Sequence, residues 1–327
     1  GRMRQSRAEV VFDRQGEGSW ISVKENGVKY GFDCEKVMYC TSNGTEKKRV
    51  GELLRRSQRH HSQLQYADTR AKQDESKHSP KKSDNSKRSS KRSSKRSMFH
   101  NSDDCKKTDR RRRGTENHRQ HRSAIVPHGA MSDEVVVDLY AGIGYFTLPY
   151  LVLGGAKHVH ACEINPDSVA ALRKNLVANK IGDDRCTVWP GDNEESVAAH
   201  LLGIADRVNM GLIPSCEDAL HIGVAALRID RGGWLHVHGN APRKERAVWA
   251  EHIARSVQGL LTERVLISGW QVVCTHIEKV KAYAPRVDHL VCVVWAGPWY
   301  AAPCEVKICR TKKRVEAFCQ IHLKEKE

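Results

Sequence analysis

The second half of the chain alternates short apolar runs with longer segments whose apolar residues recur at helical spacing. The short runs predict strands at 135–139, 158–162, 186–189, 205–212 and 233–238, and the longer segments predict helices at 146–153, 166–179, 219–227 and 246–261. Two further apolar runs, 270–280 and 288–295, predict a closing pair of strands. Since repeating strand–helix units build a doubly wound, mostly parallel sheet, we predict an α/β fold.

The first fifty residues show a different pattern. Two β-rich segments, 19–25 and 28–32, flank the dipeptide Asn26-Gly27. Asn-Gly is favoured in two-residue hairpin turns because both central positions need a positive φ. A turn entering a helix is predicted at 43–54.

These patterns divide the chain into four parts. Residues 1–54 are predicted to form a small N-terminal β-rich unit, and residues 131–297 the sheet domain. Between them, residues 55–130 form a basic, low-complexity insert that we expect to be disordered, because Ser, Lys and Arg alternate there without an apolar period. Residues 298–327 are a basic C-terminal tail.

Most of the positive charge lies in the insert. The net charge is +16, and residues 72–122 hold 18 basic and 7 acidic side chains. Such a segment predicts a polyanionic partner, with nucleic acid as the leading candidate. A solvated segment without a ligand, a nuclear-targeting tract and a phosphorylation-regulated spacer are alternatives that fit the same composition.

The cysteines bear on the compartment and on metal binding. Eleven cysteines with no Cys-x-x-Cys pair predict reduced thiols and a cytoplasmic protein, although the basic insert leaves a nuclear location open. Cys304, Cys309, Cys319 and His322 match no common zinc spacing, so we expect no metal. No apolar run reaches membrane-spanning length, and the first residues are polar and basic. We therefore expect no membrane association and no signal peptide. We also expect the protein to be a monomer.

Polar residues and glycines follow the predicted strands, where ligands bind in such sheets. Asp138 and the loop Gly142-x-Gly144 follow the first strand, and Glu163 follows the second. Small loop residues let the backbone approach a nucleoside, and Glu163 can accept both ribose hydroxyls. Asp192, after the third strand, can accept from an adenine amine.

Two features distinguish S-adenosylmethionine from NAD as the nucleoside cofactor. Thr147 stands where pyrophosphate binding requires a third glycine, and an acidic residue follows the third strand. The pattern therefore predicts a Rossmann-like, class I S-adenosylmethionine-dependent transferase domain. The fourth strand ends in a turn containing Leu212 and Pro214, and in this architecture that position faces the substrate base. Such a segment is also common as a simple strand-terminating turn.

Read together, these motifs resemble the wybutosine-synthesis 3-amino-3-carboxypropyl transferases of tRNA. The matching segments are 38–47, 138–146, 162–166, 191–193, 211–215 and 281–289, and the resemblance covers about residues 8–54 and 132–295. The related guanine-N1 methyltransferases of the same tRNA site have a similar loop. They tend to carry Asn-Leu-Pro after the fourth strand, whereas this chain has Leu-Ile-Pro.

The resemblance implies cofactor contacts at Lys47, Glu163, Asp192 and Asn193. It also implies one at Cys40, where the family usually has serine, and a thiol is the weaker hydrogen-bonding group. Lys47 comes from the N-terminal unit, and the resemblance implies that it pairs with the carboxylate of the methionine moiety.

The implied activity transfers the aminocarboxypropyl group of S-adenosylmethionine to 4-demethylwyosine, next to the anticodon of phenylalanine tRNA. We identify no general base: Asp138 is a candidate only by position, and it can equally orient the glycine loop. The alternatives are a tRNA guanine-N1 methyltransferase and a non-catalytic RNA-binding protein that keeps the fold.

Overall fold

The computed structural model of the 327-residue chain describes residues 18–55, 132–264 and 269–302. All of them belong to one of the chain's two units, Gly1–Ser62 together with Gly129–Glu327. Almost all of the predicted basic insert, and most of the tail, lie outside the described residues. Within the described ranges, no helix combines the length and the apolar character that crossing a membrane requires.

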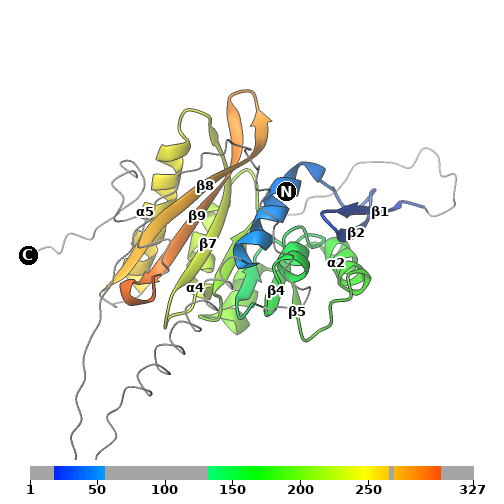
Figure 1. The fold of residues 1–327 in the computed structure, drawn as a ribbon, viewed down its shortest axis with the longest axis horizontal. Helices are drawn as coiled ribbons and strands as arrows, with labels where there is room; N and C mark the ends of the chain where they lie inside the picture. Colours follow the sequence, from blue (N-terminus) through cyan, green and yellow to red (C-terminus); the bar gives the residue numbers. More distant parts are fainter. Residues whose placement is uncertain (1–17, 56–131, 265–268, 303–327) are drawn as a thin grey trace, which may run out of the picture. The chain divides into compact units, whose positions relative to one another are not determined.

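A seven-stranded sheet with the order β5-β4-β3-β6-β7-β9-β8 forms the centre (Figure 1). Its strands are β3 (Val135–Asp138), β4 (His158–Glu163), β5 (Cys186–Pro190), β6 (Arg207–Met210), β7 (Gly233–Pro242), β8 (Trp270–Ala284) and β9 (Val287–Pro298). The first five are parallel, and β9 and β8 are added antiparallel to β7. The predicted α/β class, doubly wound sheet and closing strand pair are confirmed.

Helices cover both faces of this sheet because successive strand residues point to opposite sides. Val137 packs in a cluster with α4 (Leu220–Ala226) and α5 (Arg246–Arg264). Its neighbour Val136 packs in a second cluster with α2 (Pro166–Ala178) and the helix of residues 44–55. A short helix that the sequence did not predict, α3 (Asn193–Ser196), follows β5.

The N-terminal unit begins with the predicted hairpin. Strands β1 (Trp20–Glu25) and β2 (Val28–Asp33) pair antiparallel. Asn26 and Gly27 adopt φ angles of 52° and 85°, which is the conformation that a two-residue hairpin turn requires. A 3-10 turn, Thr41–Asn43, then leads into the predicted helix of residues 44–55.

The hairpin is attached to the sheet domain through α2. The buried Asn175 side chain accepts from the Gly31 N–H at 2.6 Å and donates to the Gly31 carbonyl at 3.0 Å. The same amide donates to the carbonyl of Ile143 at 2.9 Å. One turn further along, Asn179 makes an equivalent pair of bonds with the backbone of Lys29, at 2.9 and 2.7 Å. The two amides therefore fix the position of β2 on α2.

Replacing Asn175 with Ala is expected to lower the free energy of unfolding by about 3 kcal/mol, because it leaves buried backbone groups of Gly31 and Ile143 without partners. Chemical denaturation measures this. The matched control is Val177→Ala, whose side chain on the same helix is 76% exposed and should change stability by less than about 0.5 kcal/mol. Equal stability of N175A and wild type would contradict the attachment.

Candidate functional site

The glycine loop follows β3 and is supported by Asp138. This carboxylate is fully buried and accepts from the Thr147 hydroxyl at 2.8 Å and from the Asn209 amide at 2.9 Å. Burial raises the pKa of Asp138, and these hydrogen bonds act in the opposite direction. Both oxygens of Asp138 therefore face protein groups, an arrangement that fits the alternative role of orienting the loop.

Glycine is required in the loop itself. Gly142 and Gly144 have φ angles of 56° and 100°, in the region that side chains disfavour. A Cβ atom on Gly142 would also lie 2.8 Å from the ring of Tyr145. Both positions therefore disfavour any residue with a side chain.

Glu163, at the end of β4, connects the loop to the start of α2. Its Oε2 accepts from the Gly142 N–H at 2.7 Å, and its Oε1 accepts from the Asn165 N–H at 2.8 Å. Burial raises the pKa of Glu163, and the backbone N–H donors partly offset this. Since a carboxylate oxygen has two acceptor sites, each oxygen keeps capacity for one hydroxyl of a ribose.

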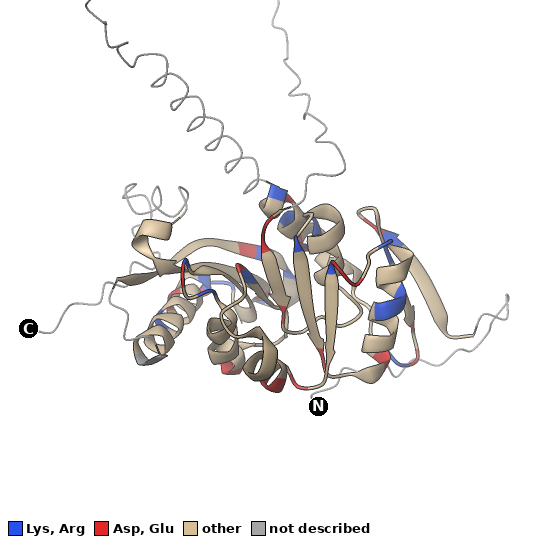
Figure 2. Cartoon of the chain, turned by 90° about the horizontal axis from the view of Figure 1, so that it is seen from below, with Lys and Arg blue, Asp and Glu red and all other residues tan. Residues whose placement is uncertain are grey.

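The third strand end lies beside Glu163, because the Gly191 N–H donates to the Glu163 carbonyl at 3.0 Å. Asp192 caps α3 by accepting from the Glu194 N–H at 2.8 Å. Asn193 donates to the carbonyl of Leu139 at 3.0 Å and so connects this end to β3. The structure therefore brings the three predicted strand ends together. Figure 2 shows that acidic and basic residues are distributed over several elements of the described chain.

Lys47 lies in an aromatic enclosure. Its side chain is 1% exposed, and its ammonium lies 2.5 Å from the Glu25 carboxylate. The rings of Tyr30, Tyr39 and Tyr145 surround it, with centroids at 4.6, 5.0 and 5.4 Å. Burial lowers the pKa of Lys47, and Glu25 opposes this effect. A contact of Lys47 with a cofactor carboxylate, as the family resemblance implies, requires the amine to exchange or share Glu25.

Cys40 lies in a second cluster, with a residue that the sequence did not assign to the site. Lys281, on β8, donates to the Ser42 hydroxyl at 2.8 Å and to the Cys40 thiol at 3.2 Å. Burial raises the pKa of Cys40, but hydrogen bonds from Ser42 and Lys281 outweigh it and lower the pKa overall. Lys281 opens the family-like segment 281–289, which was the available signal for it.

Leu212 and Pro214 lie in the turn after β6, as predicted. The Pro214 carbonyl accepts from the Asn240 N–H at 2.8 Å, which attaches the turn to the end of β7. Leu212 is half-buried and Pro214 is exposed. Their contact with a substrate base stays a prediction.

The assembled residues fit S-adenosylmethionine chemically. Glu163 offers acceptors for the ribose, and Lys281 offers a cation for a carboxylate. No group of three potential metal ligands occurs in the described ranges. The C-terminal residues considered for zinc, Cys304, Cys309, Cys319 and His322, lie outside them.

Comparisons with known proteins agree with this assignment. The TRM5/TYW2 methyltransferase domain model matches residues 114–262. A "tRNA wybutosine-synthesizing protein 2/3/4" of Arabidopsis thaliana is 34% identical over 276 residues, which cover 84% of this chain and 19% of that protein. A Danio rerio "tRNA wybutosine-synthesizing protein 2 homolog" is 43% identical over 188 residues, covering 49% of this chain and 45% of the homolog. The chain thus spans less than half the length of these relatives.

Solved structures share the fold. The M. jannaschii TYW2 structure in complex with AdoMet has a TM-score of 0.55 at 21% identity, and the match covers 86% of this chain and 88% of that one. Trm5b of Pyrococcus abyssi has a TM-score of 0.53 at 19% identity, covering 85% of this chain and 56% of that one.

Affinity for S-adenosylmethionine is expected to fall as the pH is lowered, because protonated Glu163 accepts fewer hydrogen bonds. Since burial raises the pKa of Glu163, the loss should begin at a higher pH than for an ordinary glutamate. Glu163→Gln should bind on the order of tenfold more weakly near neutral pH and lose this pH dependence. Calorimetry measures both effects. Glu194→Gln, at a side chain that is 67% exposed, is the control, and wild-type affinity in E163Q would refute the assignment.

Proposed function

The chain belongs to the TRM5/TYW2 family, and from this premise we propose that it transfers the 3-amino-3-carboxypropyl group of S-adenosylmethionine to tRNA. The names of its curated relatives refer to wybutosine synthesis. Two TYW2 structures that share its fold are complexes with AdoMet and with MeSAdo. These names support an aminocarboxypropyl transferase over the methyltransferase branch.

The proposed acceptor is 4-demethylwyosine, next to the anticodon of phenylalanine tRNA. A carbon of this base forms a bond to the Cγ of the methionine moiety while the Cγ–sulfur bond breaks. The electron pair of that bond stays on sulfur, which leaves as methylthioadenosine, and the proton displaced from the base carbon passes to solvent. The base must leave its stack to reach the pocket.

S-adenosylmethionine supplies a sulfonium group, and a nucleophile can attack any of the three carbons bonded to its sulfur. The protein must therefore select one carbon by position. Glu163 fixes the ribose end, and Lys281 with the Ser42 hydroxyl fixes the carboxylate end. Between these two anchors the chain determines which carbon meets the base.

The observation that carries the proposal is the meeting of Lys281 with Cys40 and Ser42. It places a cation and a hydroxyl from two distant segments at one point, beside the enclosure of Lys47. An α-carboxylate is the cofactor group that such a pair suits. Asp138, buried between Thr147 and Asn209, acts in this proposal as a support for the loop.

Incubation of the chain with S-adenosylmethionine and phenylalanine tRNA carrying 4-demethylwyosine should release methylthioadenosine in a one-to-one ratio with modified tRNA. Mass spectrometry of the small-molecule products measures this, with Glu163→Gln as a low-activity control. Detection of S-adenosylhomocysteine alone would instead identify a methyltransferase and contradict the proposal.

Replacing Lys281 with Met is expected to lower kcat/KM at least tenfold, mainly through a higher KM for S-adenosylmethionine, because the variant cannot make a charge-assisted hydrogen bond to the carboxylate. Lys281→Arg keeps the charge and should recover part of the activity. Lys244→Met, at an exposed lysine before α5, is the matched control. Steady-state kinetics on all three variants test this contact. An unchanged KM for S-adenosylmethionine in K281M would exclude this role of Lys281.

A further inference from the structure

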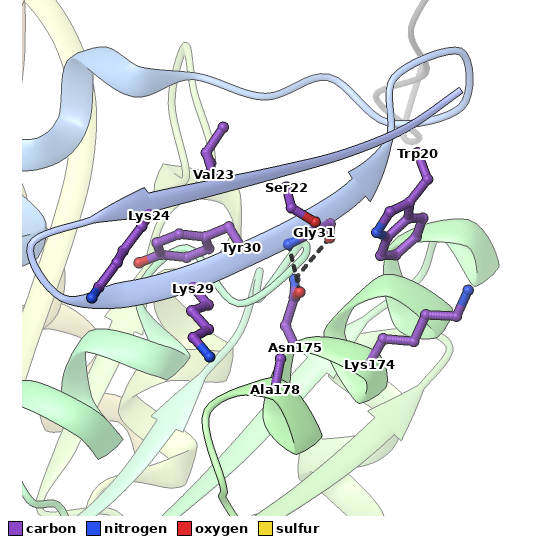
Figure 3. A pocket seen from close by; sticks show the side chains of 10 residues that line it. All are labelled: Trp20, Ser22, Val23, Lys24, Lys29, Tyr30, Gly31, Lys174, Asn175 and Ala178. Carbon is purple, nitrogen blue, oxygen red and sulfur yellow. Dashed lines mark hydrogen bonds between the residues drawn. The ribbon is translucent and has the colours of Figure 1, made fainter. Parts of the chain in front are cut away.

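A basic groove lies between the β1–β2 hairpin and α2, separate from the strand ends just described (Figure 3). Its volume is about 520 Å³, and its ten lining residues include three lysines and no acidic side chain. Lys24 and Lys29 belong to the hairpin, and Lys174 belongs to α2. Positive charge therefore faces the groove from both walls.

These three lysines carry uncompensated charge. All three are exposed, and in the described part of the chain no carboxylate lies within ion-pair distance of them. Glu25, which follows Lys24 in the sequence, forms its ion pair with Lys47 instead. It also accepts a hydrogen bond from the Tyr39 hydroxyl at 2.9 Å. The groove thus has a net positive field that an anion can neutralise.

The walls of the groove are held in place. The Asn175 bonds to Gly31 cross it from α2 to β2 (Figure 3). The ring of Trp20 lies so close to Gly31 that a Cβ there would be 2.7 Å from it. The amine of Lys174 lies 4.3 Å from the centre of the same ring, a cation–π contact that positions the charge. Such a groove needs little rearrangement before a ligand binds.

We propose that this hairpin groove binds the phosphodiester backbone of the RNA substrate, outside the cofactor site. Lysines on two walls suit a chain of phosphates because each is a flexible point charge. The ring of Trp20 already packs against Gly31 and Lys174, so the groove offers charge rather than base stacking. The binding is therefore independent of base sequence.

The groove is also connected to the site it would serve. Asn175, which spans the groove, donates to the Ile143 carbonyl within the glycine loop. The helix that carries Lys174 begins beside Glu163, whose carboxylate accepts from the Asn165 N–H. RNA held at the hairpin groove is thus held on the element that positions the loop. This inference rests on the proposed function, since it assigns a binding surface for the same RNA.

The test compares Lys29→Gln/Lys174→Gln with the matched pair Lys157→Gln/Lys244→Gln, whose lysines are exposed elsewhere. Both pairs are made in the full 327-residue chain, so the basic insert contributes equally to each. Binding of phenylalanine tRNA is measured over a series of salt concentrations. The groove pair should bind on the order of tenfold more weakly. A plot of the logarithm of the binding constant against the logarithm of the salt concentration should have a slope that is smaller in magnitude by about 1.5. Each phosphate that a lysine neutralises contributes about 0.7 to 0.9 to that magnitude.

Affinity for S-adenosylmethionine, measured on the same samples, should stay at the wild-type value in both pairs. Equal tRNA affinity and salt slope in the groove pair and the control pair would overturn the groove assignment and leave the proposed function intact. If the wild-type chain binds no tRNA at any salt concentration, the proposed function fails and the inference fails with it.

Discussion

The buried amide of Asn175 joins the three parts on which the site depends. It bonds both backbone polar groups of Gly31 on the hairpin, and it donates to Ile143 in the glycine loop. The position of the hairpin in turn decides where Glu25 meets Lys47. Because these groups are buried, each broken bond leaves an unsatisfied polar atom, so the N-terminal unit, α2 and the loop hold one another in a single arrangement.

Much of the fold was predictable because apolar runs dominate the strands, and the turn at Asn26-Gly27 needs a backbone that few residue pairs adopt. The closing strands were harder to delimit. β8 runs to Ala284, four residues beyond the predicted end. Its last third is largely exposed and interrupted by register shifts such as that between Lys279 and Lys281, so its sequence lacks a clean alternation.

The strand-end residues of the site were predictable for a topological reason, since parallel strands bring their carboxyl ends to one edge. The strand ends that carry Glu163 and Asp192 are neighbours, because the Gly191 N–H donates to the Glu163 carbonyl. Pairings across the chain were not predictable. Lys281 and Ser42 are 239 residues apart, and nothing local in either segment indicates that they meet. Likewise, the Lys47 side chain gave no sign that Glu25 and three tyrosines enclose it, because Glu25 and Tyr30 come from the hairpin and Tyr145 comes from the glycine loop.

The central claim is that the aminocarboxypropyl group, rather than the methyl group, reaches the tRNA. In the proposed function this choice is made by holding both ends of one flexible molecule, so the modified nucleoside in the cell records the outcome. Mass spectrometry of phenylalanine tRNA from cells that lack the protein tests it most directly. We expect 4-demethylwyosine to accumulate in place of later intermediates. Unmodified guanosine at that position would contradict the account and identify the chain as the methyltransferase that acts earlier on the same base.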